Sequence, residues 1–550
     1  MIRNKIITFI KIRIDFFAIF AVFLSSFTFY IPAIEGDFVF DDIPLISSDP
    51  FYHADTQSSY FDCFTRTWWR KDFSQGLYRP ITLCTYLFNV KIGGLESPGF
   101  RFTNILINSI LCALLYLLFY RFSSDRLIAF FSAILFAIHP LYSEAIIPAS
   151  GRADLLAALF LVCGILIHVS NWRFRYLFTF ICGLLAILSK ETGILLLPLI
   201  LLYDLFFICD FRKKMFGLSK SIYSYVAVFL SVLVYFLMRI YLVSYLFPRF
   251  SDAQYWSDNH LGLMKFWDRL PTALWLQVFA VWKFIFPKHL SHDYSYAAIV
   301  PINSFYDLRI SQIILFFIIL ISMIIFLYNK NLRTLLFYLT AYFISVLPTA
   351  NILTPIGTIF GERLYYFPGV FLCIFSISIV IFYMQNKKLS KKMVAIFAIT
   401  IFFSFLVRLS LRISDWRDQY SLACAGVKTS PGSFKVWNNY GLQLYDKNLI
   451  EEADKAFTKS IEINPSNLPA WRNRGNCRLK LGKNKEALSD FLECINIGTK
   501  DVSVYNKAGA LMAIEGNKAE AIRFWKKSLT INPNQSEISK FLSELLKDGE

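Results

Sequence analysis

Two adjacent carboxylates, Asp41 and Asp42, are the residues of this sequence that most clearly suggest chemistry. They follow the run Phe38-Val39-Phe40, just after an uncharged hydrophobic stretch over residues 16–34. Two like charges side by side repel each other, so one of them is expected to have a raised pKa or a cationic partner. A solvated loop or a helix cap is the simpler explanation, because Asp is common at such positions. The alternative is a carboxylate base at a membrane face, which would accept a proton from a hydroxyl group.

Further ionisable residues lie against or within apolar stretches, where charges are costly and are usually paired or functional. Carboxylates suit a base, whereas arginine can bind a phosphate through two hydrogen bonds. A site with both signs at a bilayer face fits the transfer of a group from a lipid phosphate. For any single pair, an ion pair between helices is the alternative. The residues are Arg79, His139, Glu144, Arg152, Asp154, Lys190, Glu191, Asp293, Glu362 and Arg363.

One more arginine, Arg239, lies inside the apolar stretch 223–246. A cation there needs either a carboxylate partner or a lipid phosphate. The sequence leaves both explanations open.

The composition predicts a membrane protein. Hydrophobic residues make up 56% of the 550 residues, and a soluble protein of this size would need far more polar surface. Apolar runs of about 18–20 residues recur through the first three quarters of the chain, as in polytopic membrane proteins. The net charge of +17 could suggest nucleic acid, but Lys and Arg cluster between the apolar runs and therefore orient the protein in the membrane. No nucleic-acid partner is expected.

The distribution of Lys and Arg predicts about 11 spans. The basic cluster before residue 14 places the N-terminus in the cytosol, so residues 16–34 cross outward and Asp41 faces the lumen or the exterior. The apolar stretch 274–286 is short. If it crossed the membrane, the basic clusters after the later spans would no longer lie in the cytosol, so it is expected to be re-entrant or interfacial. With 393–407 as the last span, the C-terminal tail lies on the same side as Asp41.

The polar tail contains an internal repeat with a period of 34 residues. The period and the pattern are those of the tetratricopeptide repeat (TPR), a helix–turn–helix unit whose aromatic and small positions pack on the next unit. A helix over Ser536–Lys547 is expected to cap the array. Cys477 and Cys494, also in the tail, could pair as a disulfide. The repeated positions are Trp437, Trp471 and Tyr505; Gly441, Gly475 and Gly509; Ala453, Ala487 and Ala521; Phe457, Phe491 and Trp525.

Several motifs, in family order, resemble the membrane half of the TMTC family, proteins named for their transmembrane spans and TPR repeats. The resemblance runs from about residue 35 to the tail, and the motifs together are highly specific. The chain departs from the family pattern at Arg101 and Asn108, where the family often has histidines on either side of the asparagine that corresponds to Asn104. The TPR array is also shorter than in animal members. The motifs are FVFDD (38–42), YRP (78–80), HPLYSEA (139–145), GRADL (151–155), SKETG (189–193), LSHDYSY (290–296), PIGTIFGERL (355–364) and DW (415–416).

The resemblance implies a GT-C type glycosyltransferase related to the protein O-mannosyltransferases. Such enzymes take a sugar, usually mannose, from a polyprenyl phosphate such as dolichyl phosphate and transfer it outside the cytosol to Ser or Thr. It implies that Asp41 and Asp42 are the catalytic pair, with one acting as base. It also makes Arg79, Arg152, Lys190 and Arg363 candidate phosphate contacts, while the other ionisable residues named above are candidates for donor or acceptor binding. The lipid-linked donor is the one group that it implies, the need for a metal is left open, and no metal ligand is assigned.

The sequence therefore predicts an all-α protein in two parts. A GT-C-like transmembrane domain covers residues 1–410, with a large first outer loop over 35–100, and a linker over 411–433 leads to an extracytoplasmic TPR α-solenoid over 434–550. The array would bind or select the acceptor protein. The membrane would be the endoplasmic reticulum in a eukaryote and the plasma membrane in a bacterium. Two alternatives stay open: a bacterial polyprenyl-phosphate-sugar transferase acting on lipid or polysaccharide, and an inactive membrane-anchored TPR scaffold.

Overall fold

The structure is a computed structural model that describes residues 2–53, 57–69, 76–208, 221–243, 256–386 and 390–547. Among these residues every regular element is a helix, so the predicted all-α class is confirmed. The chain divides into two compact units. The first contains Met1–His292 and Pro301–Leu422, and the second contains Asp293–Val300 and Ala423–Glu550.

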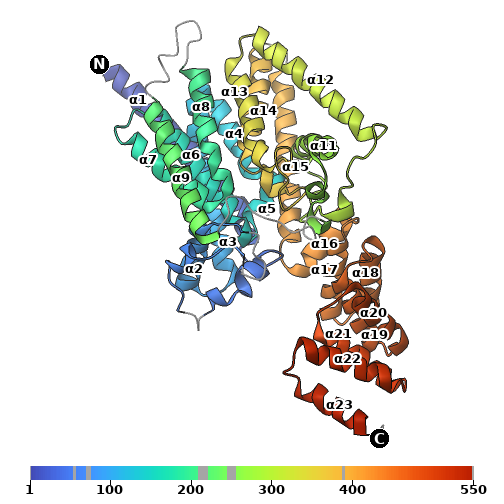
Figure 1. Ribbon diagram of the computed structural model, residues 1–550. Helices are drawn as coiled ribbons and strands as arrows, with labels where there is room; N and C mark the ends of the chain where they lie inside the picture. Colours follow the sequence, from blue (N-terminus) through green and yellow to red (C-terminus); the bar gives the residue numbers. More distant parts are fainter. Residues whose placement is uncertain are drawn as a thin grey trace. The chain divides into compact units, whose positions relative to one another are not determined.

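Apolar helices make up most of the first unit (Figure 1). Helix α6 contacts α3, α7 and α8, and α7 packs in turn on α9. The helices are α1 (Ile2–Tyr30), α2 (Pro80–Gly93), α3 (Ser97–Ser123), α4 (Arg126–Ile138), α5 (Ser143–Ile146), α6 (Arg152–Val169), α7 (Arg175–Ser189), α8 (Leu196–Phe207), α9 (Ile222–Val243), α11 (Phe266–Ile285), α12 (Leu308–Asn329), α13 (Arg333–Val346), α14 (Pro368–Gln385) and α15 (Lys391–Asp415); α16 (Gln419–Thr429) follows at the boundary between the units.

Seven helices in the described part of the chain are long and apolar enough to cross a membrane. Helix α4 and the segment Pro140–Ile146 add an eighth if this pair, bent by 51°, counts as one span. Fewer helices qualify than the predicted 11 spans, partly because α7 and α8 contain only 15 and 12 residues, whereas a span needs about 20. The predicted spans over 193–209 and 223–246 end outside the described residues.

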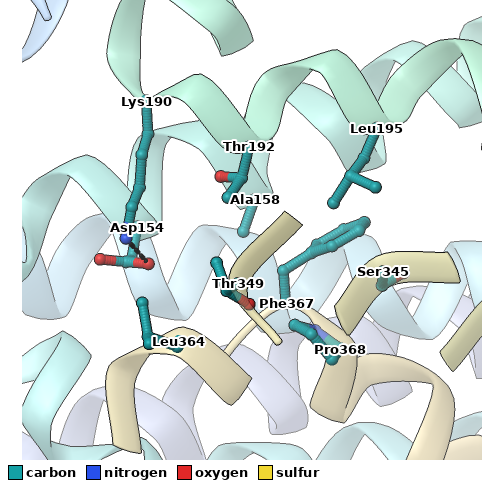
Figure 2. A pocket seen from close by; sticks show the side chains of 10 residues that line it. All are labelled: Asp154, Ala158, Lys190, Thr192, Leu195, Ser345, Thr349, Leu364, Phe367 and Pro368. Carbon is teal, nitrogen blue, oxygen red and sulfur yellow. Dashed lines mark hydrogen bonds and ion pairs between the residues drawn. The ribbon is translucent and has the colours of Figure 1, made fainter. Parts of the chain in front are cut away.

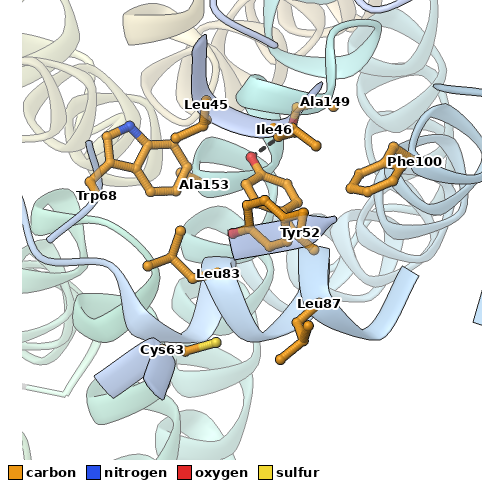
Figure 3. Packing of buried hydrophobic residues seen from close by; sticks show 11 residues of the cluster. Leu45, Ile46, Tyr52, Cys63, Trp68, Leu83, Leu87, Phe100, Ala149 and Ala153 are labelled. Atoms are coloured by element: carbon orange, nitrogen blue, oxygen red, sulfur yellow. Dashed lines mark hydrogen bonds between the residues drawn. The ribbon is translucent and has the colours of Figure 1, made fainter. Parts of the chain in front are cut away.

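The first outer loop has a hydrophobic core of its own. Residues of the loop, including Tyr52 and Trp68, pack on Leu83 of α2 and on Ala149 and Ala153 (Figure 3). Burial of such aromatic side chains provides a large hydrophobic contribution. The loop that carries the Asp pair is therefore fixed against the start of α6.

Arg101 on α3 joins three segments of the first unit. Its guanidinium donates hydrogen bonds to the carbonyl groups of Ala33 at 3.0 Å and Trp416 at 2.8 Å, and also to that of Asp37. A Cβ on Gly36 would lie 2.2 Å from Arg101 Nη1, so only glycine fits there. At this departure from the family motif, a buried arginine holds the ends of α1 and α15 beside the first loop.

The second unit contains the predicted TPR array. In each repeat the glycine lies against the aromatic residue 16 positions later, and an added Cβ would come within 2.7 Å of Phe457 or Phe491 and within 2.5 Å of Trp525. Cys477 and Cys494 are buried and free, so the suggested disulfide is not formed. The helices are α17 (Phe434–Asp446), α18 (Ile450–Ile463), α19 (Leu468–Lys480), α20 (Asn484–Ile497), α21 (Val502–Ile514), α22 (Lys518–Ile531) and α23 (Ser536–Lys547), the last with its predicted bounds.

Candidate active site

The neighbouring residues Asp41 and Asp42 lie in different surroundings. Phe40 has a φ of 52°, a left-handed conformation that is rare for a bulky residue and that turns the backbone just before the pair. The Asp42 side chain is fully buried, whereas the Asp41 side chain is 21% exposed. The two carboxylates therefore differ in what they can reach.

Backbone donors surround the carboxylate of Asp42. The N–H groups of Ser150 and Ala149 donate to its two oxygens at 2.7 and 3.1 Å, and that of Val39 donates at 3.4 Å. Burial raises the pKa of Asp42, and hydrogen bonds from Ser150 and Ala149, together with the charge of Arg101, oppose that rise. Asp42 thus holds the turn η7 (Ala149–Gly151) against the first loop.

The cation that faces Asp41 is Arg363. Its Nη1 atom lies 3.0 Å from Asp41 Oδ2, and its Nε atom lies 3.6 Å from Glu144 Oε1. The backbone N–H of Arg363 also donates to Glu144 Oε2 at 3.0 Å. Burial lowers the pKa of Arg363, but the carboxylates of Asp41, Glu144 and Asp154 together raise it by more, so Arg363 stays charged. Arg363 is therefore anchored by Glu144 and orients Asp41.

Two further ion pairs are formed by residues that the sequence singled out. Lys190 Nζ lies 2.5 Å from Asp154 Oδ1, and Arg79 Nη2 lies 2.7 Å from Glu191 Oε2. Burial raises the pKa of Glu191, but Arg79, a backbone hydrogen bond and the charge of Arg239 together lower it by more, so the net direction is down. Burial and the charges of Arg79 and Arg363 lower the pKa of Lys190, and the charge of Asp154 raises the pKa of Arg363. The structure thus brings seven of the predicted residues into one network: Asp41, Arg79, Glu144, Asp154, Lys190, Glu191 and Arg363.

A small pocket of about 10 Å³ lies at the Lys190–Asp154 pair. Figure 2 shows Lys190 reaching Asp154 at one end and Phe367 with Leu195 at the other. Hydroxyl groups of Thr192, Ser345 and Thr349 line it as well. Ser345 and Thr349 carried no signal in the sequence, because uncharged residues near an apolar helix resemble core positions. The lining residues are Asp154, Ala158, Lys190, Thr192, Leu195, Ser345, Thr349, Leu364, Phe367 and Pro368.

Arg152, a predicted phosphate contact, is surrounded by protein acceptors. It donates to Asn104 Oδ1 at 2.8 Å, to Asn89 Oδ1 at 2.5 Å and to the Phe100 carbonyl at 2.8 Å. Its side chain is fully buried and does not line the pocket. These contacts favour a structural role for Arg152 at the start of α6.

His139 and Glu362 also have buried protein partners. His139 Nδ1 accepts the N–H of Leu141 at 3.2 Å, so Nε2 is the protonated nitrogen, and it donates to the Phe284 carbonyl at 2.8 Å. Glu362 forms an ion pair with Arg412 at 3.2 Å, and both side chains are fully buried. Neither His139 nor Glu362 lines the pocket.

Asp293 belongs to the second unit. Its Oδ1 accepts the N–H of Ser295 at 2.7 Å, and its Oδ2 accepts the hydroxyl of Ser433 at 3.2 Å. In the part of the chain that the structure describes, no cluster of three or more His, Cys, Asp or Glu side chains could hold a metal ion.

Comparison with known proteins matches both parts of the chain. Residues 256–321 match the family described as "Protein O-mannosyl-transferase TMTC, DUF1736", and residues 434–467 and 456–489 match tetratricopeptide repeats. A relative in Caenorhabditis elegans, Protein O-mannosyl-transferase F38B6.6, is 28% identical over 80% of this chain and 61% of its own length. Protein O-mannosyl-transferase TMTC3 is 23% identical in Mus musculus and 22% in Homo sapiens, over 92% of this chain.

The chain spans 59–61% of the length of these three relatives. The matches lie in the apolar helices and in the TPR array, in the order that the motifs indicated. The chain is therefore a multi-pass membrane protein that resembles the TMTC proteins, as its motifs indicated.

Proposed function

We propose that this protein transfers mannose from a polyprenyl or dolichyl phosphate to Ser or Thr hydroxyl groups of other proteins. The names of its relatives as protein O-mannosyl-transferases support the reaction type. The observation that carries the proposal is the surroundings of Asp41: a partly exposed carboxylate, oriented by Arg363 and linked by charge to the pocket at Lys190 and Asp154.

Asp41, rather than Asp42, is the base in this proposal. A base must come within hydrogen-bonding reach of the proton that it removes. Asp42 has no exposed surface and its two oxygens accept three backbone N–H groups. Among the described residues, Asp41 has Arg363 as its one side-chain partner, and that bond engages a single oxygen.

In the proposed step the acceptor oxygen forms a bond to the anomeric carbon of mannose, and the bond from that carbon to the phosphate oxygen breaks. The electron pair of the broken bond goes to the phosphate, and the acceptor proton goes to Asp41. Attack from the face opposite the phosphate inverts the configuration of the anomeric carbon. Fixed cations beside the site would stabilise the developing phosphate charge.

The topology proposed for this reaction places the N-terminus in the cytosol, and the Asp41 site and the TPR array on the luminal or extracytoplasmic side. The basic clusters between apolar stretches support that orientation. The array would hold acceptor chains on its concave face, since stacked repeats form extended binding surfaces.

Asp41→Asn tests the proposal directly. We expect it to reduce transfer from a lipid-linked mannose donor to an acceptor peptide by about 100-fold or more, the usual contribution of a general base. The measurement is initial rate with the purified full chain. Asp307→Asn is the matched control, because Asp307 is also a partly exposed carboxylate paired with an arginine, Arg309, and lies outside the network.

Wild-type rates in Asp41→Asn would refute the assignment of the base. A wild-type protein that transfers mannose to no protein acceptor, while a deletion strain has altered envelope glycan, would favour the polysaccharide alternative. No transfer and no altered glycan would favour the scaffold.

A further inference from the structure

Arg239 carries hydrogen-bond donors that the protein itself leaves unused. It lies on α9, within the candidate membrane span Ile222–Leu242, and its side chain is 1% exposed. Its Nη1 atom donates to the Tyr235 hydroxyl at 3.2 Å, whereas Nε and Nη2 have no partner among the described residues. A buried guanidinium without acceptors is costly, and more so inside a membrane.

A second unpartnered atom lies in the same region. Glu191 Oε2 pairs with Arg79, but Glu191 Oε1 is buried and has no hydrogen-bond partner in the described residues. The charge of Arg239 lowers the pKa of Glu191, and the charges of both residues influence the Tyr235 hydroxyl group. Arg239 thus has two unused donors, and Glu191, which lies within range of its charge, has one unused acceptor.

The surrounding side chains fix the guanidinium and isolate it from water. The Tyr235 hydroxyl, which accepts from Arg239, lies 3.5 Å from the carbonyl oxygen of Tyr78. Tyr78, Tyr235, Ile187 and Leu188 form a buried hydrophobic cluster at this place. Low polarity strengthens the attraction between a fixed cation and an anion that enters.

The charge balance identifies the kind of ligand. Arg79, Arg239 and Glu191 together leave one positive charge, whereas the negative half of the network has two carboxylates, Asp41 and Glu144, for one cation, Arg363. A sugar-linked polyprenyl phosphate is a phosphodiester with one negative charge and an apolar tail. It would neutralise the positive half of the network and leave Asp41 on the negative half for the acceptor hydroxyl.

We propose that Arg239 is a phosphate-binding residue of the donor site, which takes the phosphate group of a polyprenyl phosphate through its Nε and Nη2 donors beside Arg79. This inference rests on the proposed function for the identity of the lipid, but the binding can be tested without sugar transfer. Of the two explanations that the sequence left open for Arg239, the structure favours the phosphate, because no carboxylate among the described residues forms an ion pair with it.

The test measures the binding of farnesyl phosphate, a short analogue of the polyprenyl phosphate that the transfer would release, to the full chain in phosphatidylcholine nanodiscs by thermal shift. We expect Arg239→Gln to weaken binding by about tenfold or more, as expected for loss of charge-assisted hydrogen bonds, and Arg239→Lys to weaken it less. Arg309→Gln, at an arginine paired with Asp307, is the control and should bind as the wild type does.

A second readout separates a ligand contact from a structural contact. Removing an unpaired buried charge should leave the melting temperature of the ligand-free protein unchanged or raise it. If Arg239→Gln lowers that temperature while binding is retained, Arg239 is structural and the inference is wrong. Tyr235→Phe, which removes the side-chain acceptor that Arg239 has among the described residues, is the second variant and should weaken binding about threefold to tenfold.

Competition identifies the source of the phosphate. Displacement of farnesyl phosphate by millimolar inorganic phosphate would support a site that recognises the phosphate group. Equal displacement by phosphatidylglycerol would overturn the assignment to a polyprenyl lipid. Binding through Arg239 without any sugar transfer would refute the proposed function and keep this inference, whereas wild-type transfer kinetics in Arg239→Gln would refute this inference and keep the function.

Discussion

The difference between Asp41 and Asp42 arises one residue earlier, at Phe40. Its left-handed backbone turns the chain so that one carboxylate enters the buried turn at Ala149–Gly151 and the other reaches Arg363. Such strained conformations cluster at functional sites. The edge of the Phe40 ring also contacts the imidazole of His292, with 5.1 Å between ring centroids, which helps to hold the turn.

Asp42→Asn should destabilise the first unit. An asparagine amide group in place of one carboxylate oxygen would face a backbone N–H donor, and a buried donor left without its acceptor costs about 1–3 kcal/mol. The measurement is the free energy of unfolding of the purified protein in detergent, with Asp307→Asn as the control. Unchanged stability of Asp42→Asn would contradict the structural role derived from the three N–H donors.

His292 should make the stability depend on pH. Burial between Phe40 and Trp416, together with the nearby Arg412 charge, lowers its pKa to about 3. The folded protein therefore holds this histidine neutral while the unfolded chain protonates it below its ordinary pKa of about 6.5. The contribution to the free energy of unfolding is constant above that pH and falls as the pH decreases towards 3.

We expect the His292 contribution to lower the free energy of unfolding by about 2.5 kcal/mol between pH 7 and pH 4.5. Because carboxylates also titrate in this range, the measured quantity is the difference between wild type and His292→Phe at both pH values. Equal pH dependence in the two proteins would show that His292 is solvated or charged in the fold.

At the scale of elements, short breaks between helices position the site. Helix α4 ends at Ile138 before Pro140, which cannot donate the next helical hydrogen bond. The chain then forms the short helix α5, which carries Glu144, and the turn η7, which meets Asp42. A continuous span would have placed Glu144 and the η7 turn elsewhere.

Gly151→Ala should disrupt this arrangement. An added Cβ would lie 2.2 Å from the carbonyl oxygen of Ala145, and backbone atoms cannot move aside cheaply. We expect a loss of about 1–3 kcal/mol and a loss of transfer activity, because the turn that binds Asp42 must shift. Thermal unfolding is the measurement.

Gly99→Ala provides the matched control for that substitution. Gly99 lies in α3, and an added Cβ would meet nothing within 4 Å. Alanine should therefore be neutral or stabilising by up to about 1 kcal/mol. Equal effects of the two substitutions would show that the contact with Ala145 is not what constrains Gly151.

At the scale of the whole molecule, each of the two compact units is built from two separate segments of the sequence. The segment Asp293–Val300 belongs to the TPR unit, although the residues on both sides of it belong to the first unit. Within the TPR unit Tyr296 packs on Phe434 at 5.1 Å between ring centroids, and Asp293 accepts the hydroxyl of Ser433, the cap of α17. The motif that contains Asp293 therefore supports the first repeat.

Asp293→Ala should loosen the start of the array and leave donor binding intact. We expect faster amide hydrogen exchange in α17 (Phe434–Asp446), because the capping Ser433 loses its partner, and unchanged affinity for farnesyl phosphate. Asp501→Ala is the control, since Asp501 caps α21 and should affect that helix alone. Lost donor binding with unchanged exchange in α17 would instead place Asp293 in the donor site, as the family resemblance implied.

The all-α class and the TPR array were predictable because they rest on local patterns. A period of 34 residues repeats one packing contact, glycine against an aromatic ring, and that contact forms within each helix pair. Apolar runs likewise predict membrane helices. Their number was less predictable, because an apolar run such as α8 can pack inside a bundle without being long enough to cross a bilayer alone.

The sequence by itself determined which residues could take part in chemistry, because charges next to apolar runs are visible without a fold. Only the tertiary structure decided how these residues divide. Asp41 meets Arg363, which is 322 positions away, and Asp42 meets Ser150, which is 108 positions away. Burial and hydrogen-bond saturation depend on such distant partners, and no local pattern encodes them. For the same reason the sequence could not distinguish Arg152 from Arg239 as a possible phosphate contact. In the structure, Arg152 is enclosed by protein acceptors, whereas Arg239 retains unused donors.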